Sequence, residues 1–423
     1  MTIPKQEFWG GCSVRSKLTV MCIAGMVSCG FTSASVAGEL TFKPSLMVAE
    51  EYNDNIYETW NNRESDFITH LIPGITANYK APLWDWDLTY SLDYAYYARL
   101  KEDETSHGLS TRGLVKLIDE FLFLEVSDTY RKTSLDVTRD VTQEGVLGGD
   151  QTDQNIFTAS PYMVFHPSER TTLRTGYRYT NVWYKEASAV DKTENGAFAD
   201  LTYQMTDKFS LTGGYLFTHQ DTDIQDYDKH DVYGGFRYEY AEGSFIHGRA
   251  GNSWIGYQGG RDVSNPFWNA GISHALDTVT LSFDTGVVYT EDPRSVITEE
   301  TSYTGRAIKK FARGDLGVSL NYAEYRNTEL DALDTTRYGT GLNGRYDLAE
   351  SLIGHLNFTA ERYNDKLINT YTNRFVVDYG VTYAIAKDLS IALNHRYIDY
   401  SSPVIINDNK RINRVILSLN KAF

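Results

Sequence analysis

The sequence has little cysteine and little proline. Its three cysteines, Cys12, Cys22 and Cys29, all precede residue 38, so a chain cut there would hold no thiol. Such a chain has neither a disulfide framework nor a cysteine metal site. Only 9 prolines stand against 31 tyrosines. This bias favours pleated, half-buried strands, because proline breaks strands and tyrosine suits their surfaces.

Long hydrophobic runs and positive charge are also lacking. After residue 38 no apolar run reaches the roughly 18 residues that a transmembrane helix needs, and helical periodicity is hard to find. The formal net charge is -16. The first 37 residues carry three basic side chains and one acidic one, a net +2, so the cut chain would carry -18. This acidity argues against a nucleic-acid partner.

The N-terminus has the pattern of an export signal. Arg15 and Lys17 precede an apolar stretch at 18–31, and a run of small residues follows with Ser35 and Ala37 at the specificity positions of a signal peptidase. The stretch of about 14 residues is shorter than the roughly 20 that span a bilayer. We therefore expect cleavage after Ala37.

This cut divides the chain into a signal peptide, residues 1–37, and a mature barrel domain, residues 38–423. The alternative is attachment of lipid at Cys29. Met26 stands where such a signal usually has leucine.

Strict alternation of apolar and polar residues runs through the mature chain. In its clearest stretch, every even position from Trp84 to Tyr96 is apolar or aromatic, while Asp85, Asp87 and Asp93 lie among the odd positions. Successive side chains of a strand point to opposite faces, so this segment has one apolar face and one acidic face. The alternating segments have the roughly ten residues that a tilted strand needs to cross a bilayer.

Connections between these segments alternate in length, as in transmembrane barrels with short periplasmic turns and long extracellular loops. The short ones include the turns near Pro82 and Pro167. We expect an all-β, antiparallel, up-and-down transmembrane barrel of about 20 strands, with about 18 as the alternative count. The expected extracellular loops are 54–64, 99–107, 131–151, 181–192, 219–229, 256–264, 290–300, 326–334, 364–370 and 399–409.

The face opposite the apolar one should line the lumen. A barrel of about 20 strands is too wide for side chains to fill, so it encloses a channel or must be plugged. No segment that would form a plug precedes the first expected strand. The charged residues expected on the lumen wall are Asp85, Asp87, Asp93, Arg174, Arg178, Arg237, Asp284, Arg306, Arg337, Arg345, Arg374, Asp378 and Arg396.

The last expected strand ends on an aromatic residue. Val415, Leu417 and Leu419 share a face with Phe423. Such a strand resembles the signal by which the outer-membrane barrel assembly machinery recognises its clients. Lys421 departs from that pattern, and its charged end can reach the periplasmic interface.

No catalytic or metal-binding constellation stands out, and we expect no enzymatic activity, no metal and no cofactor. The nine histidines are scattered, without metal-ligand spacing. Asp228, His230 and Asp231 lie beside an expected external rim, but without geometric context they are weak evidence for a protease site. The carboxylates between Asp221 and Asp231 could bind a divalent cation, although the glycine turn of a calcium loop is missing.

The first expected hairpin carries a recognisable motif, Glu51, Tyr52, Asn53, Asp54 and Asn55. It resembles the β-barrel porin type 2 family, whose members accompany exopolysaccharide and exosortase gene clusters in Gram-negative bacteria. The resemblance implies a cell outer membrane component of polysaccharide secretion. Its implied partners are periplasmic polysaccharide export or co-polymerase proteins and a polysaccharide cargo.

Three functions remain open from the sequence. The first is a passive outer-membrane channel for export of an exopolysaccharide, and the second is a general diffusion porin for small hydrophilic solutes. The third is a structural or adhesive surface barrel that acts through its loops. In each case the surroundings are outer-membrane lipid and lipopolysaccharide.

Overall fold

The chain forms one closed β-barrel. The computed structural model describes residues 38–135, 151–258, 260, 262–328, 332–406 and 409–423. The expected signal peptide, its cleavage site and Cys29 lie outside the described residues. Within them, no helix is long and apolar enough to cross a membrane.

Twenty antiparallel strands of 12 to 18 residues make up the barrel wall. This confirms the expected architecture and the larger of the two strand counts, while the count of about 18 is wrong. The strands are β1 (Glu39–Asn53), β2 (Asp66–Ala81), β3 (Trp84–Tyr97), β4 (Glu102–Ile118), β5 (Leu122–Ser134), β6 (Gln151–Ser168), β7 (Thr171–Tyr184), β8 (Lys192–Thr206), β9 (Phe209–Thr222), β10 (Tyr227–Ala241), β11 (Ser244–Tyr257), β12 (Val263–Ala275), β13 (Val279–Glu291), β14 (Ile297–Phe311), β15 (Gly314–Asn327), β16 (Ala332–Ala349), β17 (Leu352–Asp365), β18 (Thr370–Ala386), β19 (Leu389–Ser401) and β20 (Arg411–Ala422).

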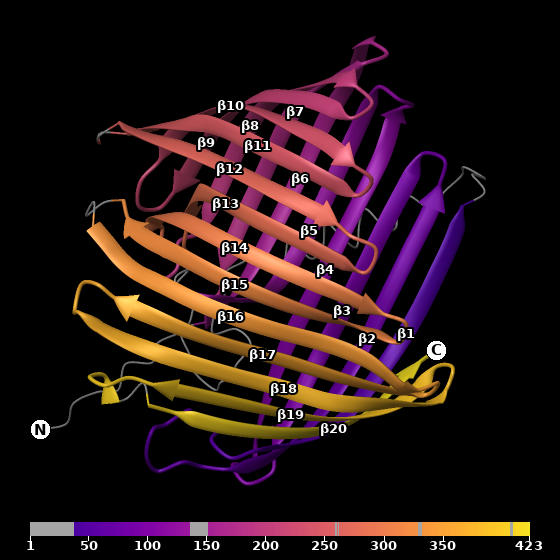
Figure 1. The fold of residues 1–423 in the computed structure, drawn as a ribbon, viewed down its shortest axis with the longest axis vertical. Coiled ribbons are helices and arrows are strands. Elements are labelled where there is room, and N and C mark those ends of the chain that lie inside the picture. Colours follow the sequence, from indigo (N-terminus) through magenta and orange to yellow (C-terminus); the bar gives the residue numbers. More distant parts are fainter. Residues whose placement is uncertain (1–37, 136–150, 259, 261, 329–331, 407–408) are drawn as a thin grey trace, which may run out of the picture.

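Each strand pairs with the next along the chain, and the first strand closes the ring by pairing with the last. The β1–β20 register runs from Ser45 opposite Ala422 to Asn53 opposite Arg414. In Figure 1 the indigo and magenta strands form the far wall and the orange and yellow strands the near wall, with the C-terminus beside β1. Closure leaves no unpaired sheet edge, which is the condition for crossing hydrocarbon with strands.

The two rims differ in the length of their connections. At one rim the turns are very short: residues 82 and 83 are the whole turn between β2 and β3. At the other rim the loops are longer, but several strands extend into segments that we expected to be loops. β4 begins at Glu102, inside the expected loop 99–107, and β10 begins at Tyr227, inside 219–229. The hydrogen bonds of a hairpin can continue beyond the apolar face of its strands, so alternation alone placed the starts of β4 and β10 too late in the chain.

Large apolar side chains lie on the outside of the wall. Phe42 is 55% exposed, Leu320 63% and Leu393 48%. Such exposure on every side suits a surface in contact with lipid. In the part of the chain that the structure describes, buried apolar side chains form small clusters near the long-loop rim. One consists of Ile56, Ile68, Ala95 and Tyr97, and another of Ile398, Tyr400 and Ile412.

Candidate functional site: the inner wall

The strand register assigns each charged side chain to one face of the wall. Directly opposed residues in an antiparallel pair share a face. Asp87 stands opposite Arg112, and Arg112 stands opposite Ser127, whereas the alternate position Trp84 is exposed among the outer apolar residues. Following these pairs around the ring separates an apolar outer face from a polar inner face.

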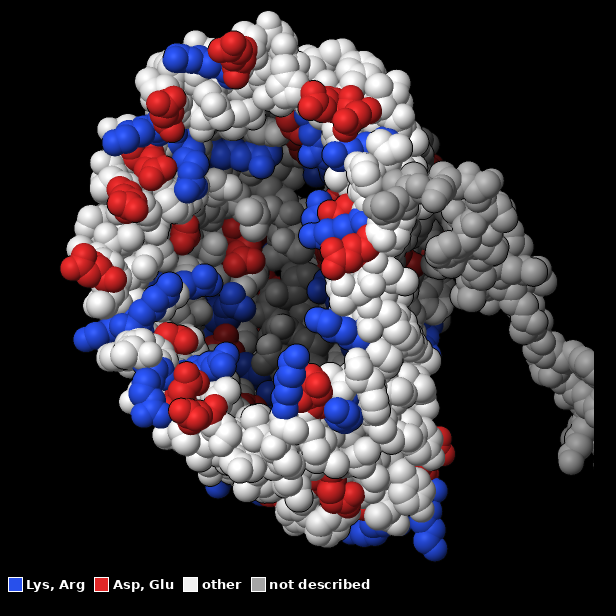
Figure 2. Space-filling view, turned by 90° about the vertical axis from the view of Figure 1, so that its right-hand side faces the viewer, with Lys and Arg blue, Asp and Glu red and all other residues white. Residues whose placement is uncertain are grey.

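All of the charged residues that we expected on the lumen wall lie on this inner face by register. Figure 2 shows a hollow at one end of the molecule, with basic and acidic side chains around its wall. They are spread around the wall and do not form one cluster. The structure thus places their side chains, while their role in conduction stays a prediction. The residues are Asp85, Asp87, Asp93, Arg174, Arg178, Arg237, Asp284, Arg306, Arg337, Arg345, Arg374, Asp378 and Arg396.

A charged network joins the first three strands to the last. Arg414 of β20 donates two hydrogen bonds of 2.7 Å to the carboxylate of Glu51, which is 1% exposed. On the other side of Glu51, His70 lies 3.6 Å away and makes a 2.9 Å contact with Asp93. Charge-assisted, bidentate pairs are strong and geometrically specific. The network therefore fixes the register at the seam where the barrel closes.

The motif Glu51–Asn55 lies at the long-loop end of this seam. Asp54 accepts hydrogen bonds from the backbone N–H and the side-chain amide of Asn413, both at 2.7 Å. The Asn55 side-chain amide donates to the carbonyl of Arg411 at 2.9 Å. Tyr52 points to the other face, where its ring packs 5.1 Å from that of Phe67. In this structure the motif links the first strand to the last.

Inward arginines on β18 and β19 are paired with carboxylates. Arg374 lies 2.8 Å from Glu361, and both side chains are mostly buried. Arg396 lies 2.8 Å from Asp378, which also lies 3.2 Å from His355. Pairing of opposite charges along this arc leaves a polar wall with little net charge.

At the long-loop rim, β8 is bound to the end of β13. Lys192 begins β8 and lies 2.8 Å from Glu291, the last residue of β13, five strands further along the wall. Gln220 donates a hydrogen bond to Glu291 at 3.4 Å and accepts one from the hydroxyl of Tyr227 at 2.7 Å, and that hydroxyl lies 3.3 Å from Glu291. Lys192 is only 6% exposed. We call Lys192, Gln220, Tyr227 and Glu291 the rim latch.

The β13–β14 loop completes the rim latch. The Lys192 ammonium donates to the carbonyl of Asp292 at 3.2 Å, and the N–H of Val190 donates to the carbonyl of Pro293 at 2.7 Å. The loop itself is shaped by Asp292, whose carboxylate accepts from the N–H groups of Arg294 and Val296. The rim latch therefore joins the start of β8 to the β13–β14 loop, which lies about 100 residues further along the chain.

A second arc of the inner wall, on β6–β11, carries arginines over aromatic rings. The distance from the guanidinium carbon to the ring centroid is 4.1 Å for Arg174 over Tyr162, 5.3 Å for Arg178 over Phe198, 3.5 Å for Arg237 over Phe245 and 3.5 Å for Arg249 over Tyr233. Guanidinium groups are held by the negative face of an aromatic ring. These arginines are thereby fixed along the wall.

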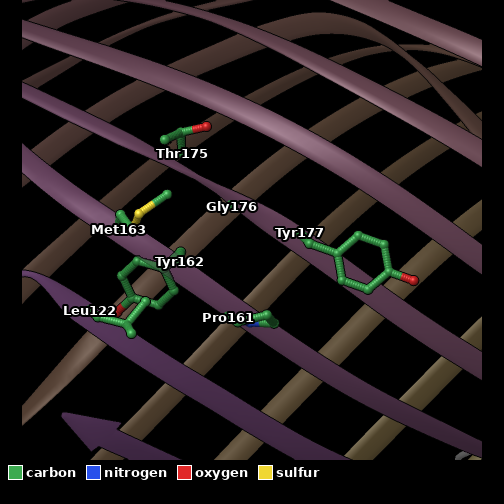
Figure 3. Close-up of a pocket in the computed structure, with 7 residues that line it drawn as sticks. All are labelled: Leu122, Pro161, Tyr162, Met163, Thr175, Gly176 and Tyr177. Carbon is green, nitrogen blue, oxygen red and sulfur yellow. The ribbon is translucent and has the colours of Figure 1, made fainter. Parts of the chain in front are cut away.

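A shallow pocket of about 360 Å³ lies where β5, β6 and β7 meet (Figure 3). Proline has no N–H, and the β6–β7 pairing is interrupted around Pro161. The carbonyl of Tyr177, which stands opposite, accepts a bond from the Ser160 hydroxyl at 2.9 Å. Pro161 and Tyr177 belong to the outer face by register, so this pocket is not part of the lumen wall.

The residues expected to form the assembly signal lie on the outer face at the seam. Val415, Leu417 and Leu419 stand opposite Tyr52, Glu50 and Val48 of β1. Phe423 is 68% exposed, and the ammonium of Lys421 lies 5.6 Å from its ring centroid. Their recognition by the assembly machinery stays a prediction.

The acidic segment at 221–231 spans both faces. Asp228 contacts His219 at 2.7 Å on the outer face, and His219 also lies 3.2 Å from Asp221. Asp231 points inward and accepts a hydrogen bond from Ser253. Across the described part of the chain, no group of three His, Cys, Asp or Glu side chains is placed to hold a metal ion.

Sequence reasoning missed several inward residues of the wall. Arg249, Glu361 and Arg414 lie on the inner face, and the same alternation that placed their neighbours could have found them. The contact between Lys192 and Glu291 had no sequence signal, because it depends on how distant rim segments meet.

Comparisons with known proteins define the class of the fold. No family model matches the sequence, and no curated protein matches it either. Solved structures do match over most of the chain. The siderophore receptor PirA from Pseudomonas aeruginosa has a TM-score of 0.52 and 8% identity over 90% of this chain and 80% of that one. The FrpB iron transporter from Neisseria meningitidis has a TM-score of 0.52 and 9% identity, with 90% and 82% covered.

The outer membrane protein OpdK from Pseudomonas aeruginosa also matches, with 9% identity, a TM-score of 0.46 and coverage of 90% and 98%. At these identities the likeness concerns the fold alone. The chain is a large β-barrel that resembles the outer-membrane proteins of Gram-negative bacteria.

Proposed function

We propose that this barrel is an outer-membrane channel that exports an exopolysaccharide. The observation that carries the proposal is the inner wall: the closed 20-stranded ring presents a polar face with charges of both signs. A barrel of this strand number encloses a lumen that side chains cannot fill. The proposal that the cargo is a polysaccharide rests on the family resemblance of the Glu51–Asn55 motif, and the similarity to solved structures does not support it.

The pairing of charges on the wall supports passage of a hydrated polymer. Arg374 is bound to Glu361 and Arg396 to Asp378, so these charges create little local field at the wall. Sugar hydroxyls can exchange hydrogen bonds with such a wall. Conduction requires binding that is weak enough for release at each site.

A general diffusion porin is the second candidate, and the rim latch favours it. The contact between Lys192 and Glu291 joins β8 to the end of β13 across the rim, and we infer that it narrows one side of the mouth. A narrowed mouth suits small hydrophilic solutes better than a polymer. The export proposal therefore includes release of this latch when cargo passes.

The proposal includes its surroundings. The barrel sits in the outer membrane among lipid and lipopolysaccharide after signal-peptide cleavage, and the barrel assembly machinery inserts it. Periplasmic polysaccharide export or co-polymerase proteins deliver the polymer. Neither enzymatic activity nor a cofactor is part of the proposal.

Three measurements, of secreted polysaccharide, of conductance and of cell adhesion, separate the candidates. Deletion of the gene should abolish secreted matrix polysaccharide while other outer-membrane proteins stay at normal levels, and normal secretion would contradict the export proposal. Single-channel recording of the refolded barrel in planar bilayers is the second. A large, weakly selective conductance combined with normal secretion would identify a diffusion porin. Absence of conductance together with loss of cell adhesion would identify a surface barrel that acts through its loops.

A further inference from the structure

Three exposed arginines occupy one arc of the inner wall, each over an aromatic ring. Arg178 is on β7, Arg237 on β10 and Arg249 on β11, and all three are solvent-exposed. Their ring partners are, in the same order, Phe198, Phe245 and Tyr233. We call these six residues the arginine–aromatic wall.

Glycines on the neighbouring strands allow the rings to lie close against the wall. A Cβ atom added at Gly214 would fall 2.4 Å from the ring of Tyr233, and one added at Gly251 would fall 2.5 Å from the ring of Phe267. A larger residue at either position would force the facing ring or backbone to shift. On the lumen side of Tyr233 lies the guanidinium of Arg249, 3.5 Å from the ring centroid. The arrangement supports the arginine from beneath and keeps it extended along the surface.

These arginines make no close ion pair among the described residues, although Arg178 is close enough to Glu194 for an attractive electrostatic interaction. Among the described residues, no carboxylate oxygen lies within 4.0 Å of the guanidinium nitrogens of Arg178, Arg237 or Arg249. Arg374 and Arg414 on the same inner face differ from them, since Arg374 is bound to Glu361 and Arg414 to the buried Glu51. One arc of the inner wall therefore has three solvent-exposed guanidinium groups.

Such an arc is unusual in a chain with a formal net charge of -16. The net negative charge of the chain repels anions. A guanidinium group held over an aromatic ring is planar and can donate two parallel hydrogen bonds to a carboxylate. Aromatic and guanidinium planes also suit the apolar faces of sugar rings. Both properties fit a sugar that carries a carboxylate.

We propose that the arginine–aromatic wall is a binding track for a carboxylate-bearing saccharide, such as a uronic acid polymer. This inference rests on the proposed function and narrows its cargo from polysaccharide in general to an acidic one. Carboxylates of the polymer form ion pairs in turn with Arg178, Arg237 and Arg249. Exchange of a carboxylate from one arginine to the next lets the polymer move along the wall.

The test is calorimetric titration of the refolded barrel in detergent with an oligogalacturonate, and with a neutral malto-oligosaccharide of the same length. We expect the acidic oligomer to bind at least about tenfold more tightly. Arg237→Gln and Arg249→Gln should each weaken its binding by about tenfold, the scale for loss of one charge-assisted pair. Arg306→Gln is the matched control, because Arg306 is exposed on the inner wall and, among the described residues, lies over no aromatic ring. It should change the affinity less than about twofold.

Three outcomes would overturn the inference. They are equal affinity for the two oligomers, no binding of the acidic one, or the same loss in Arg306→Gln as in the wall variants. The titration does not depend on conduction, so its failure is distinct from failure of the channel itself. A barrel that conducts but shows no preference for the acidic oligomer keeps the proposed function and loses the acidic cargo.

Discussion

Arg414 on the last strand holds Glu51 on the first strand through two hydrogen bonds, from Nε to Oε1 and from the second terminal nitrogen to Oε2, each of 2.7 Å. Glu51 is 1% exposed. The pair joins strands at opposite ends of the sequence, and it lies where Asn53 stands opposite Arg414 in the register. Closure of the barrel is thereby tied to one buried ion pair.

Removal of one partner of this pair should destabilise the barrel. Arg414→Met leaves the buried carboxylate of Glu51 without its two donors, and such a loss costs roughly 3–5 kcal/mol. The free energy of unfolding, measured by urea titration in lipid vesicles, should fall by that amount. The double variant Glu51→Gln with Arg414→Met should recover much of the loss, because it removes the uncompensated charge. A single variant as stable as the parent would show that the pair does not secure the seam.

Asp54 should be a second determinant of closure. Asp54→Ala removes the acceptor of both Asn413 bonds and should cost about 2 kcal/mol, since a bond to a charged group is worth roughly 1.5–3 kcal/mol. Asp85→Ala is the control, because Asp85 is exposed near the short-turn rim of β3. Its effect should stay within about 0.5 kcal/mol. The same vesicle titration measures both, and equal effects would argue against a role for Asp54 at the seam.

Release of the rim latch should widen the mouth. Glu291→Gln removes the ion pair with Lys192 while keeping the size of the side chain, and we expect the single-channel conductance to rise and its closures to become rarer. Lys310→Met serves as the control, because Lys310 is exposed at the opposite end of the wall and changes the charge by the same magnitude. An unchanged trace in Glu291→Gln would mean that the latch does not limit conduction.

The terminal aromatic residue should act in assembly and contribute little to stability. Phe423 is 68% exposed, so Phe423→Ser loses little buried surface, and its backbone N–H can still donate to the carbonyl of Pro44. We expect the refolded variant to match the parent in urea titration, whereas its amount in outer membranes should fall severalfold. Phe311→Ser, at another exposed aromatic of the short-turn rim, controls for loss of an interfacial ring. Normal membrane levels of Phe423→Ser would contradict the assembly role.

The expected export signal has a direct mass-spectrometric test. The mature protein should begin at Gly38, and Ala37→Asp should block cleavage and retain the precursor in the inner membrane. Cys29→Ser should have no effect on mass or location. A mature chain that begins at a lipidated Cys29 would overturn the cleavage prediction and establish the alternative.

The alternation of side chains determined the wall before any tertiary contact was known. A strand places successive residues on opposite faces, so Asp87, Arg237 and Asp378 could be assigned to one face from their neighbours alone. Strand ends were less predictable. β4 begins at Glu102, in a stretch of consecutive polar residues where alternation no longer marks the start of a strand.

Only the tertiary structure decided which charges meet. The pairing of Glu51 with Arg414 requires ring closure, and the contact of Lys192 with Glu291 requires two rim segments to converge across four intervening strands. The tertiary structure also shows that two inward arginines have different partners. Arg374 is paired with a carboxylate, whereas Arg249 lies over a tyrosine ring. Alternation is a local property of the backbone. Partner choice depends on the register and curvature of the whole barrel, which no single strand encodes.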